Sequence, residues 1–358
     1  MPKILYPLLY LLSRIYAGVV LLRNACFDRK VLRSESFGVP VISVGNITVG
    51  GTGKTPHVAY LCALLLPHCR VAVLSRGYGR RTRGFRLASL QSRPDEIGDE
   101  SCLLQQRFPS LVVAVDEKRV HGIRTLLSLP EPPQVILLDD AFQHRYVRPG
   151  LSMLLADYNR PFYRDTWLPA GRMRESFSGR LRADMMVLTK TPASFTEEEL
   201  TVERERYRWP EGRPFIVTSF AYGPLLPVSD AAAVSGPRQM LHAGAFKRHE
   251  ALVVTAIASP EPFYQYVQPH VARMETLRFP DHHAFTARDI RDVLQAFDAL
   301  SGDRILLTTE KDAVRWRSAG MSDALLAFLY YIPVDITFPL NDQQAFDNMV
   351  LRKVKAVC

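Results

Sequence analysis

Cysteine is scarce in this 358-residue sequence, and its positions form no recognisable site. The cysteines make no C-x-x-C pair; they are Cys26, Cys62, Cys69, Cys102 and Cys358. A scattered, odd-numbered set does not fit a disulfide framework or a zinc site. We therefore expect a protein that works in a reducing, cytosol-facing environment.

Other signals are missing as well. The sequence contains no internal repeat and no low-complexity tract. The guanine-reading signature N/T-K-x-D is absent, because Thr189–Pro192 ends in proline and Glu310–Asp312 has the wrong spacing. Any bound nucleotide is therefore expected to be ATP. Arg23–Ala25 is a poor cleavage site, which argues against a removable signal peptide.

Charge and hydrophobicity set the broad class. The net charge is +9, and hydrophobic residues make up 47% of the chain. A chain of this length and composition can bury the cores of two ordinary domains. Its positive charge favours an anionic partner, whether nucleic acid, acidic lipid headgroups or a phosphorylated substrate.

The N-terminus carries an apolar segment, Tyr6–Leu22, whose clearly polar residues are Ser13 and Arg14. The segment is short for a bilayer span, and a charge in its middle is costly there. Basic residues follow it directly: Arg23, Arg29, Lys30 and Arg33. We expect an interfacial helix on an anionic membrane surface. A buried core helix and a true span are the alternatives.

The strongest motif lies at residues 39–55. An apolar strand, Val39–Val44, runs into a glycine-rich turn that is typical of a P-loop. Its phosphate-binding residues would be Gly50, Gly51, Thr52, Gly53, Lys54 and Thr55. Lys54 would reach the β- and γ-phosphates, and Thr55 would bind Mg²⁺. Thr48 stands where the strict motif has its first glycine.

A second apolar strand, Val135–Leu138, ends in Asp139 and Asp140, as a Walker B strand does. In a parallel sheet, both carboxylates would lie beside Lys54. A turn or a helix cap is the plainer interpretation of this acidic pair. His144 follows closely and could touch phosphate or substrate, although a lone histidine is weak evidence.

Further polar clusters are predicted to face the same crevice. Asp99 and Glu100 begin a helix, where they could be caps or a general base and a metal-shell residue. The arginine- and glycine-rich loop 76–86, with Tyr78 and Arg80, could clamp an anion or simply be solvated. Arg174 and Glu175 lie in a second mixed cluster. Asp281–His283 could ligate a metal or form an Asp–His pair.

Apolar strands alternate with helical segments from residue 39 to residue 189. The expected strands are Val39–Val44, Val71–Ser75, Leu111–Val115, Val135–Asp139, Leu151–Asp157 and Met185–Thr189. This pattern predicts a P-loop NTPase-type α/β fold with a doubly wound, mostly parallel sheet. A second, smaller α/β domain begins with Phe215–Phe220. The expected divisions are a membrane-associated helix at 1–30, a kinase domain at 31–218 and a C-terminal α/β domain at 219–358, which could pack back on the core.

Together these motifs resemble one family, the tetraacyldisaccharide 4'-kinases, which make lipid A precursors in bacteria with an outer membrane. The matching segments are VISVGNITVGGTGKTP (41–56), LSRGYGRR (74–81), GDE (98–100), VILLDDAFQHR (135–145), LPAGRMRES (168–176), LTK (188–190), FPDHHAFT (279–286) and TTEKDAVR (308–315). They span nearly the whole chain in order.

The resemblance implies an enzyme on the cytoplasmic face of the inner membrane. It would use ATP and Mg²⁺ to phosphorylate the 4'-hydroxyl of a tetraacylated glucosamine disaccharide 1-phosphate. Asp99 would be the general base, with His282 as its partner. Lys54, Asp139 and Asp140 would serve catalysis; Thr55, Asp139 and Glu100 the metal; and Tyr78, Arg80, His144, Arg174 and Glu175 the substrate.

Two other classes remain open from the residues alone. A P-loop switch or metal chaperone would hydrolyse nucleotide to change shape, and a nucleic-acid-binding ATPase would use the positive charge. The first usually carries a guanine motif and metal-binding cysteines or histidines. The second usually interleaves aromatic and basic residues. Neither pattern is well developed here, so we expect no nucleic-acid partner.

Overall fold

The computed structural model describes residues 5–228 and 246–355, so Cys358 lies outside the described part. Eight strands form the larger sheet, in the order β3-β4-β2-β5-β1-β6-β7-β8. All neighbours are parallel except β3 and β4. The strands are β1 Val41–Asn46, β2 Val71–Ser75, β3 Arg86–Leu87, β4 Val112–Val115, β5 Val135–Asp139, β6 Leu151–Asp157, β7 Met185–Thr189 and β8 Phe215–Val217.

Helices pack on both faces of this sheet, as its apolar strands require. Strands β1, β2, β5, β6 and β7 are buried along their whole length. The helices are α2 Lys54–Leu65, α3 Pro94–Ile97, α4 Asp99–Arg107, α5 Arg119–Leu127, α6 Glu197–Arg206 and α11 Gln343–Val354, with short 3-10 turns at Phe162–Arg164 and Phe177–Arg182. The predicted doubly wound α/β fold is confirmed.

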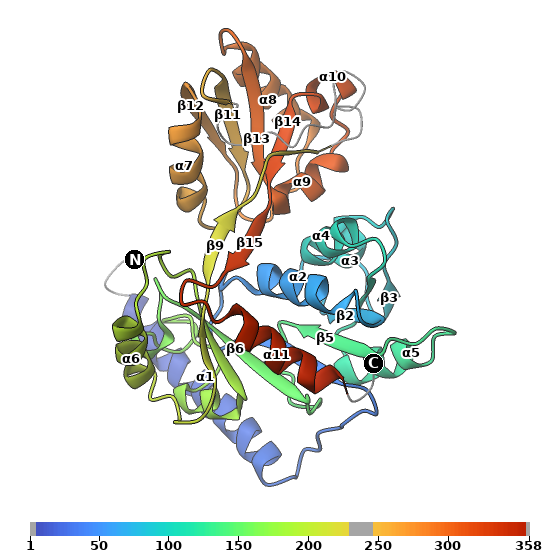
Figure 1. The fold of residues 1–358 in the computed structure, drawn as a ribbon, viewed down its shortest axis with the longest axis vertical. Helices are drawn as coiled ribbons and strands as arrows, with labels where there is room; N and C mark the ends of the chain where they lie inside the picture. Colours follow the sequence, from blue (N-terminus) through green and yellow to red (C-terminus); the bar gives the residue numbers. More distant parts are fainter. Residues whose placement is uncertain (1–4, 229–245, 356–358) are drawn as a thin grey trace.

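A second sheet has five strands, in the order β10-β14-β13-β11-β12. Its strands are β10 Leu226–Pro227, β11 Glu250–Thr255, β12 Arg273–Arg278, β13 Arg304–Thr309 and β14 Leu329–Ile332. Its helices are α7 Glu261–Val267, α8 Ala287–Asp298, α9 Glu310–Arg317 and α10 Asp323–Leu326, with a 3-10 turn at Gln268–His270. Figure 1 shows this sheet stacked at one end of the larger one.

An antiparallel pair, β9 Ser219–Tyr222 and β15 Val334–Thr337, joins the two sheets (Figure 1). The chain leaves the first sheet through β9 and returns through β15. Helix α11 then packs on the first core, where Phe346 and Val350 are buried with residues of β1 and α2. The prediction of Phe215–Phe220 as one strand of the second domain was wrong. Phe215–Val217 completes the first sheet, because the apolar run continues across the change of sheet.

The N-terminal helix α1, Leu5–Asp28, lies against the larger sheet's unit (Figure 1). Its buried residues recur at helical spacing: Ser13, Ala17, Val20, Asn24 and Phe27. The opposite side is apolar but exposed, with Ile15 59% and Leu22 68% exposed. The segment Pro7–Asp28 is long and apolar enough to cross a membrane by length and composition, and little of it is buried.

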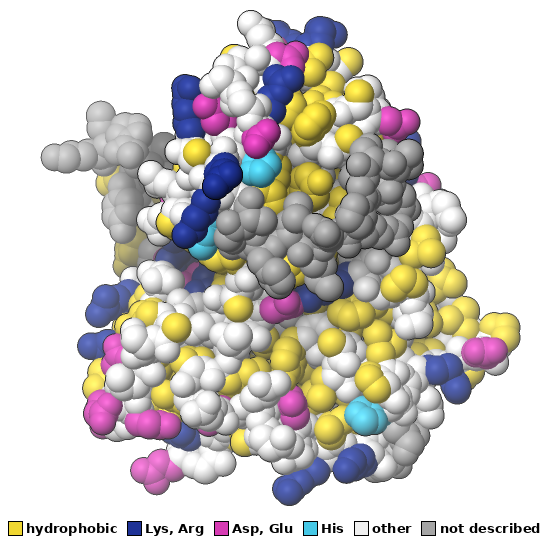
Figure 2. Space-filling view, turned by 45° about the horizontal axis from the view of Figure 1, so that its top comes forward, with side chains coloured by type: hydrophobic (Ala, Val, Ile, Leu, Met, Phe, Trp, Pro, Cys, Tyr) yellow, Lys and Arg dark blue, Asp and Glu magenta, His cyan; other side chains and the backbone are white. Residues whose placement is uncertain are grey.

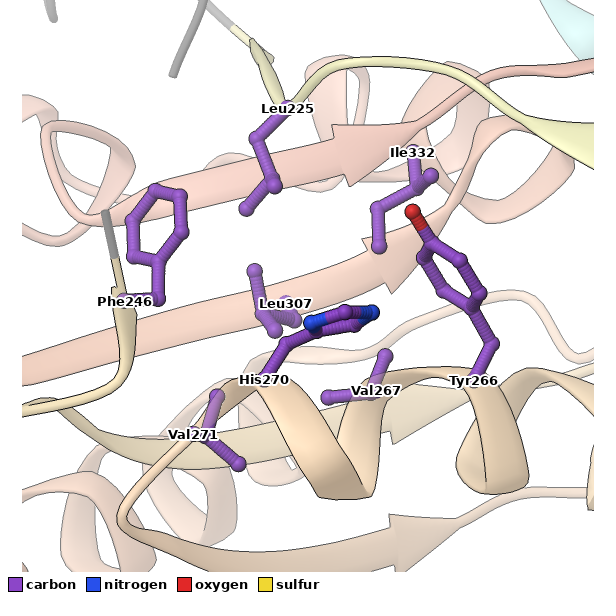
Figure 3. A pocket seen from close by; sticks show the side chains of 8 residues that line it. All are labelled: Leu225, Phe246, Tyr266, Val267, His270, Val271, Leu307 and Ile332. Carbon is purple, nitrogen blue, oxygen red and sulfur yellow. The ribbon is translucent and has the colours of Figure 1, made fainter. Parts of the chain in front are cut away.

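Charged side chains of both signs are interspersed on the face of the molecule in Figure 2. A small apolar hollow lies in the second unit, and Figure 3 shows its lining. The hollow has a volume of about 10 Å³, room for about one water molecule. It is lined by Leu225, Phe246, Tyr266, Val267, His270, Val271, Leu307 and Ile332. This hollow is too small for a nucleotide or a sugar.

Candidate active site at the junction of the two sheets

The P-loop connects β1 to α2, and α2 begins at Lys54. Gly53 has a φ of 85°, in the left-handed region that favours glycine. A Cβ atom at Gly53 would lie 2.6 Å from the Phe220 ring, so the close approach also requires glycine. Lys54 and Thr55 therefore occupy the first turn of α2, where the helix dipole favours an anion.

Side chains from outside the loop hold its backbone in place. Asn46 Nδ2 donates to Thr52 Oγ1 at 2.9 Å, and Thr189 Oγ1 donates to the Thr52 carbonyl at 2.9 Å. Lys190 Nζ donates to the Gly51 carbonyl and lies 2.8 Å from Asp157 Oδ2. These contacts pre-form the loop without consuming the side chain of Lys54.

Asp140 lies between two cations. Lys54 Nζ is 3.7 Å from its Oδ1, and Arg174 donates to both carboxylate oxygens, at 2.7 and 3.1 Å. Burial alone would raise the pKa of Asp140, but the charges of Lys54 and Arg174 and the Arg174 hydrogen bonds hold it well below its usual range. Asp140 is therefore ionised and fixes the position of Lys54.

The neighbouring Asp139 is in the opposite situation. It is 6% exposed, and its Oδ1 has no hydrogen-bond partner among the described residues. Burial raises the pKa of Asp139 to about 7, and the charges of Asp140 and Glu100 add to this effect, while Lys54 partly offsets it. Mg²⁺ is usually bound by one or two carboxylates together with phosphate oxygens of the substrate. The buried Asp139 oxygen that lacks a hydrogen-bond partner is available as such a ligand.

No cluster of three or more His, Cys, Asp or Glu residues suited to a metal occurs among residues 5–228 and 246–355. A dedicated protein cage is not required for Mg²⁺, which keeps several waters and binds phosphate oxygens. Asp139, with Thr55 on the P-loop, therefore fits this ion.

A second polar group forms where α4 meets the second sheet's unit. His282 Nδ1 lies 2.8 Å from Asp99 Oδ2, and Arg315 Nε donates to Asp99 Oδ1 at 3.0 Å. A second Arg315 nitrogen donates to Asp99 Oδ2. Burial opposes ionisation, but the hydrogen bonds from His282 and Arg315 and the charges of Arg315 and Lys311 hold the pKa of Asp99 well below its usual range. The carboxylate is thus ionised, and the predicted Asp99–His282 pair is in contact.

Glu100 connects the two groups. Its carboxylate lies 3.2 Å from Lys311 Nζ, and its charge contributes to raising the pKa of Asp139. Lys311 Nζ also lies 3.0 Å from His282 Nε2. Asp99 and Glu100 are the first two residues of α4, directly after Gly98, whose φ of 86° favours glycine and whose Cβ would lie 2.8 Å from the Tyr78 carbonyl.

The other predicted substrate residues are placed as follows. Tyr78 is 70% exposed, and its ring lies edge-on to His282, with centroids 5.3 Å apart. Burial lowers the pKa of His144 to about 4, and the charge of the nearby Asp140 partly offsets this effect. Arg80 folds inward, and its side chain is 3% exposed and paired with Glu117 at 2.5 Å. Arg80 thus shapes its own loop.

Glu175 is not part of this site. It is fully buried, accepts a hydrogen bond from Asn24 of α1 and pairs with Arg182 at 3.1 Å. A soluble or lipid ligand cannot reach it, so the prediction of a substrate contact is corrected to a structural tie between α1 and the core. The sequence placed it wrongly because its neighbour Arg174 does face Asp140.

The two histidines of the Asp281–His283 segment have different partners. His282 turns toward Asp99, whereas His283 Nε2 lies 2.9 Å from Asp289 Oδ2 at the start of α8. His282 thus forms an Asp–His pair with Asp99, whereas His283 makes a contact in the first turn of α8.

Several residues of the site carried no predicted role: Asn46, Arg119, Lys190, Lys311 and Arg315. Arg119 is buried near Asp139 and Asp140. Burial lowers the pKa of Arg119 to about 10, and the charges of the two carboxylates partly offset this effect. Lys190, Lys311 and Arg315 lie in LTK and TTEKDAVR, two segments that carried the resemblance. Their local sequence is ordinary for a strand end and a helix start, so their roles emerge from tertiary contacts.

Known proteins are similar to this chain in sequence and in fold. The family model described as LpxK, tetraacyldisaccharide-1-P 4'-kinase, matches residues 5–355. The tetraacyldisaccharide 4'-kinase of Bacteroides thetaiotaomicron is 45% identical over 352 residues, covering 97% of this chain and 93% of that protein. The enzyme of the same name from Flavobacterium johnsoniae is 40% identical over 353 residues, covering 99% and 97%. A crystal structure of LpxK from Aquifex aeolicus in complex with ATP has a TM-score of 0.74 at 27% identity, covering 98% and 99%.

Proposed function

The chain belongs to the tetraacyldisaccharide-1-P 4'-kinase family, and from this we propose that its site transfers the γ-phosphoryl group of ATP to the 4'-hydroxyl of a tetraacylated glucosamine disaccharide 1-phosphate. The product is the bis-phosphorylated lipid A precursor, lipid IVA. The observation that supports this most directly is that the P-loop group and the paired Asp–His are linked through Glu100, whose charge reaches Asp139 and whose carboxylate pairs with Lys311 beside His282.

The P-loop side handles the nucleotide. Backbone N–H groups of Gly50–Gly53 and the start of α2 surround the phosphates. Lys54, held by Asp140, contacts the β- and γ-phosphate oxygens. Thr55, Asp139 and Glu100 would hold Mg²⁺, which would supply positive charge to the phosphates. Positioning and charge do most of the work, since phosphoryl transfer needs little covalent help from the protein.

The Asp99–His282 side handles the acceptor. A sugar hydroxyl is a poor nucleophile, so a base must take its proton as transfer proceeds. Arg315 engages both oxygens of Asp99. The proton therefore goes to Nε2 of His282, and Asp99 orients the ring and stabilises its positive charge. Tyr78, which packs against His282, and Arg174 and His144, which lie near Asp140, would contact the acceptor or the nucleotide.

The acceptor carries acyl chains, so the enzyme must meet it at a membrane. The exposed apolar side of α1 suits burial in the outer part of a bilayer, with Arg23 and the basic residues after α1 on anionic headgroups. The cytoplasmic face of the inner membrane is the place where ATP is available. In this proposal residues 1–30 are the membrane-associated segment, residues 31–218 the nucleotide-binding domain and residues 219–358 the second domain. Helix α11 of the last range packs on the core of the first sheet.

Incubation of the purified protein with ATP, Mg²⁺ and the disaccharide 1-phosphate in detergent tests this function. We expect ADP and a bis-phosphorylated lipid in equal amounts. ADP release without a phosphorylated lipid would indicate an ATPase or a switch protein instead.

A further inference from the structure

The ring nitrogen that we assign as the proton acceptor already has a partner in this structure. Lys311 Nζ lies 3.0 Å from His282 Nε2 and 3.2 Å from Glu100 Oε1. Both partners are about one-quarter exposed, so a substrate can displace the ammonium group. Lys311 is the second residue of α9 and belongs to the second sheet's unit, whereas Glu100 belongs to α4 of the first.

Hydrogen-bond chemistry fixes the direction of these contacts. An ammonium group can donate but cannot accept, so Nε2 of His282 must supply a lone pair. The proton of the neutral ring is then on Nδ1, which donates to the ionised Asp99 at 2.8 Å. Arg315 also lies 3.2 Å from Nδ1, because both groups share Asp99 Oδ2. Lys311 therefore selects the tautomer whose Nε2 can act as a base, but it also covers that nitrogen.

The acceptor hydroxyl needs the same lone pair, so it and Lys311 cannot occupy Nε2 together. Glu100, the other partner of Lys311, acts through its charge on Asp139 at the proposed Mg²⁺ site. When phosphates and Mg²⁺ enter beside Asp139, anionic oxygens compete with Glu100 for the ammonium group of Lys311. A cation with two replaceable partners, one of them a carboxylate whose charge reaches Asp139, can change partners during the reaction.

We propose that Lys311 is a catalytic residue that covers His282 Nε2 before the substrates bind and moves to the transferring phosphoryl group when the acceptor hydroxyl takes its place. This rests on the kinase function proposed above. In the step itself, the hydroxyl proton passes to Nε2, and the hydroxyl oxygen forms a bond to the γ-phosphorus. The bond from that phosphorus to the β,γ-bridging oxygen breaks, and ADP leaves. Throughout this transfer, Lys311 from the second sheet's unit and Lys54 from the first neutralise the charge on the phosphoryl oxygens.

The test compares Lys311→Met and Lys311→Arg with wild type in steady-state kinase assays using ATP and the disaccharide 1-phosphate. Methionine keeps most of the side-chain shape without the charge. We expect Lys311→Met to lower kcat by about 10²-fold or more, as for loss of one transition-state donor. Its KM for ATP should change less than about threefold, because the contact forms only as transfer proceeds. Lys311→Arg should restore kcat to within about tenfold of wild type, since it keeps the charge.

Glu310→Gln is the matched control. Glu310 precedes Lys311 on α9. Its carboxylate lies 3.3 Å from the guanidinium group of Arg107, the last residue of α4, and so links α9 to α4 without contacting Asp99 or His282. It should keep kcat within about threefold of wild type, as a residue outside the transition state does.

A wild-type kcat in Lys311→Met would overturn the proposal, and so would an equal loss in Glu310→Gln, which would show that Lys311 only ties the two units. In either case an active wild type leaves the kinase function standing. A wild type that phosphorylates no lipid would instead overturn the function itself.

Discussion

Asp139 and Asp140 are adjacent in the chain, yet their surroundings drive their pKa values in opposite directions. Asp140 contacts Lys54 and Arg174, whereas Asp139 is buried with an oxygen that has no partner among the described residues. The sequence predicted an acidic pair at the end of a strand. It could not show which member faces cations, because Arg174 comes from a distant segment. Of the two carboxylates, Asp139 is the one with a buried oxygen that has no partner among the described residues, as expected of a Mg²⁺ ligand.

Replacing Lys54 tests the P-loop at the scale of one side chain. Lys54→Ala removes the cation that the phosphates meet, and we expect kcat/KM to fall by at least about 10²-fold. Asp139→Ala should have an effect of similar size through weaker Mg²⁺ binding. Lys118→Ala is the control, since this lysine lies directly before α5 and its side chain is exposed. Near-normal turnover of the Lys54 variant would reject the assignment of the P-loop.

His57 gives the protein a predictable response to acid. Its ring is buried, with Nδ1 2.7 Å from the Gly53 carbonyl and Nε2 3.0 Å from Thr218 Oγ1. Burial lowers the pKa of His57 from 6.5 to about 4. A histidine with a depressed folded pKa contributes stability above its unfolded pKa, and this is lost as pH falls from 6.5 through 4.

The loss amounts to about 3 kcal/mol in the free energy of unfolding. Urea titrations at several pH values can measure it by comparing the protein with His57→Gln, which cannot titrate. The advantage of the wild type over the variant should shrink by that amount between about pH 7.5 and about pH 4. A constant difference across this range would show that His57 is charged or accessible in the folded state.

At the scale of elements, α1 has two faces with different tasks. Its inner face is fixed by polar contacts, since Ser13 accepts a hydrogen bond from the Ala170 N–H and Asn24 donates to Glu175. Its outer face exposes large apolar side chains. The sequence indicated an apolar helix near a membrane but did not show the polar stripe that docks it. That stripe explains the burial of Glu175, which the sequence alone assigns to the substrate site.

Charge placed on the outer face tests its membrane role without disturbing the inner one. Ile15→Glu with Leu22→Glu puts carboxylates on exposed positions, so the melting temperature should change little. Membrane insertion of these charges is costly, and vesicle binding should weaken by about tenfold or more. Val202→Glu, at a comparably exposed apolar position on α6, is the control. Unchanged binding of the double variant to anionic vesicles would contradict an interfacial role for α1.

Most buried strands of the first sheet were predictable, because their apolar runs are long and bounded by turns. Strands β2, β5, β6 and β7 begin and end where the sequence indicated. Strand β12 was not predicted, since it lies at a sheet edge and its residues, such as Arg273 and Glu275, are exposed and charged. The pair β9 and β15 was also missed, because its partners are far apart in the chain.

At the scale of the whole molecule, the site exists because the two sheets meet. The P-loop and the Walker B carboxylates are local motifs on neighbouring strands, and the sequence was enough to place them. Arg315 and Asp99 are separated by 216 positions, and their contact depends on how α9 docks against α4. No pattern in the sequence predicts how α9 docks against α4. The contacts of Arg315 with Asp99 and of Lys311 with His282 are therefore visible only in the structure.

The most direct test of a single site shared by both sheets is a double-mutant cycle on kcat for lipid phosphorylation, with Asp99→Asn and His282→Ala. Asparagine keeps the shape of Asp99 beside Arg315, and ATP affinity should stay within about threefold of wild type in every variant. Each single change should lower kcat by at least about 10²-fold, and the double variant should be little worse than the worse single, because the two residues act as one unit. Losses that multiply fully in the double variant would show that Asp99 and His282 act independently and would contradict this account.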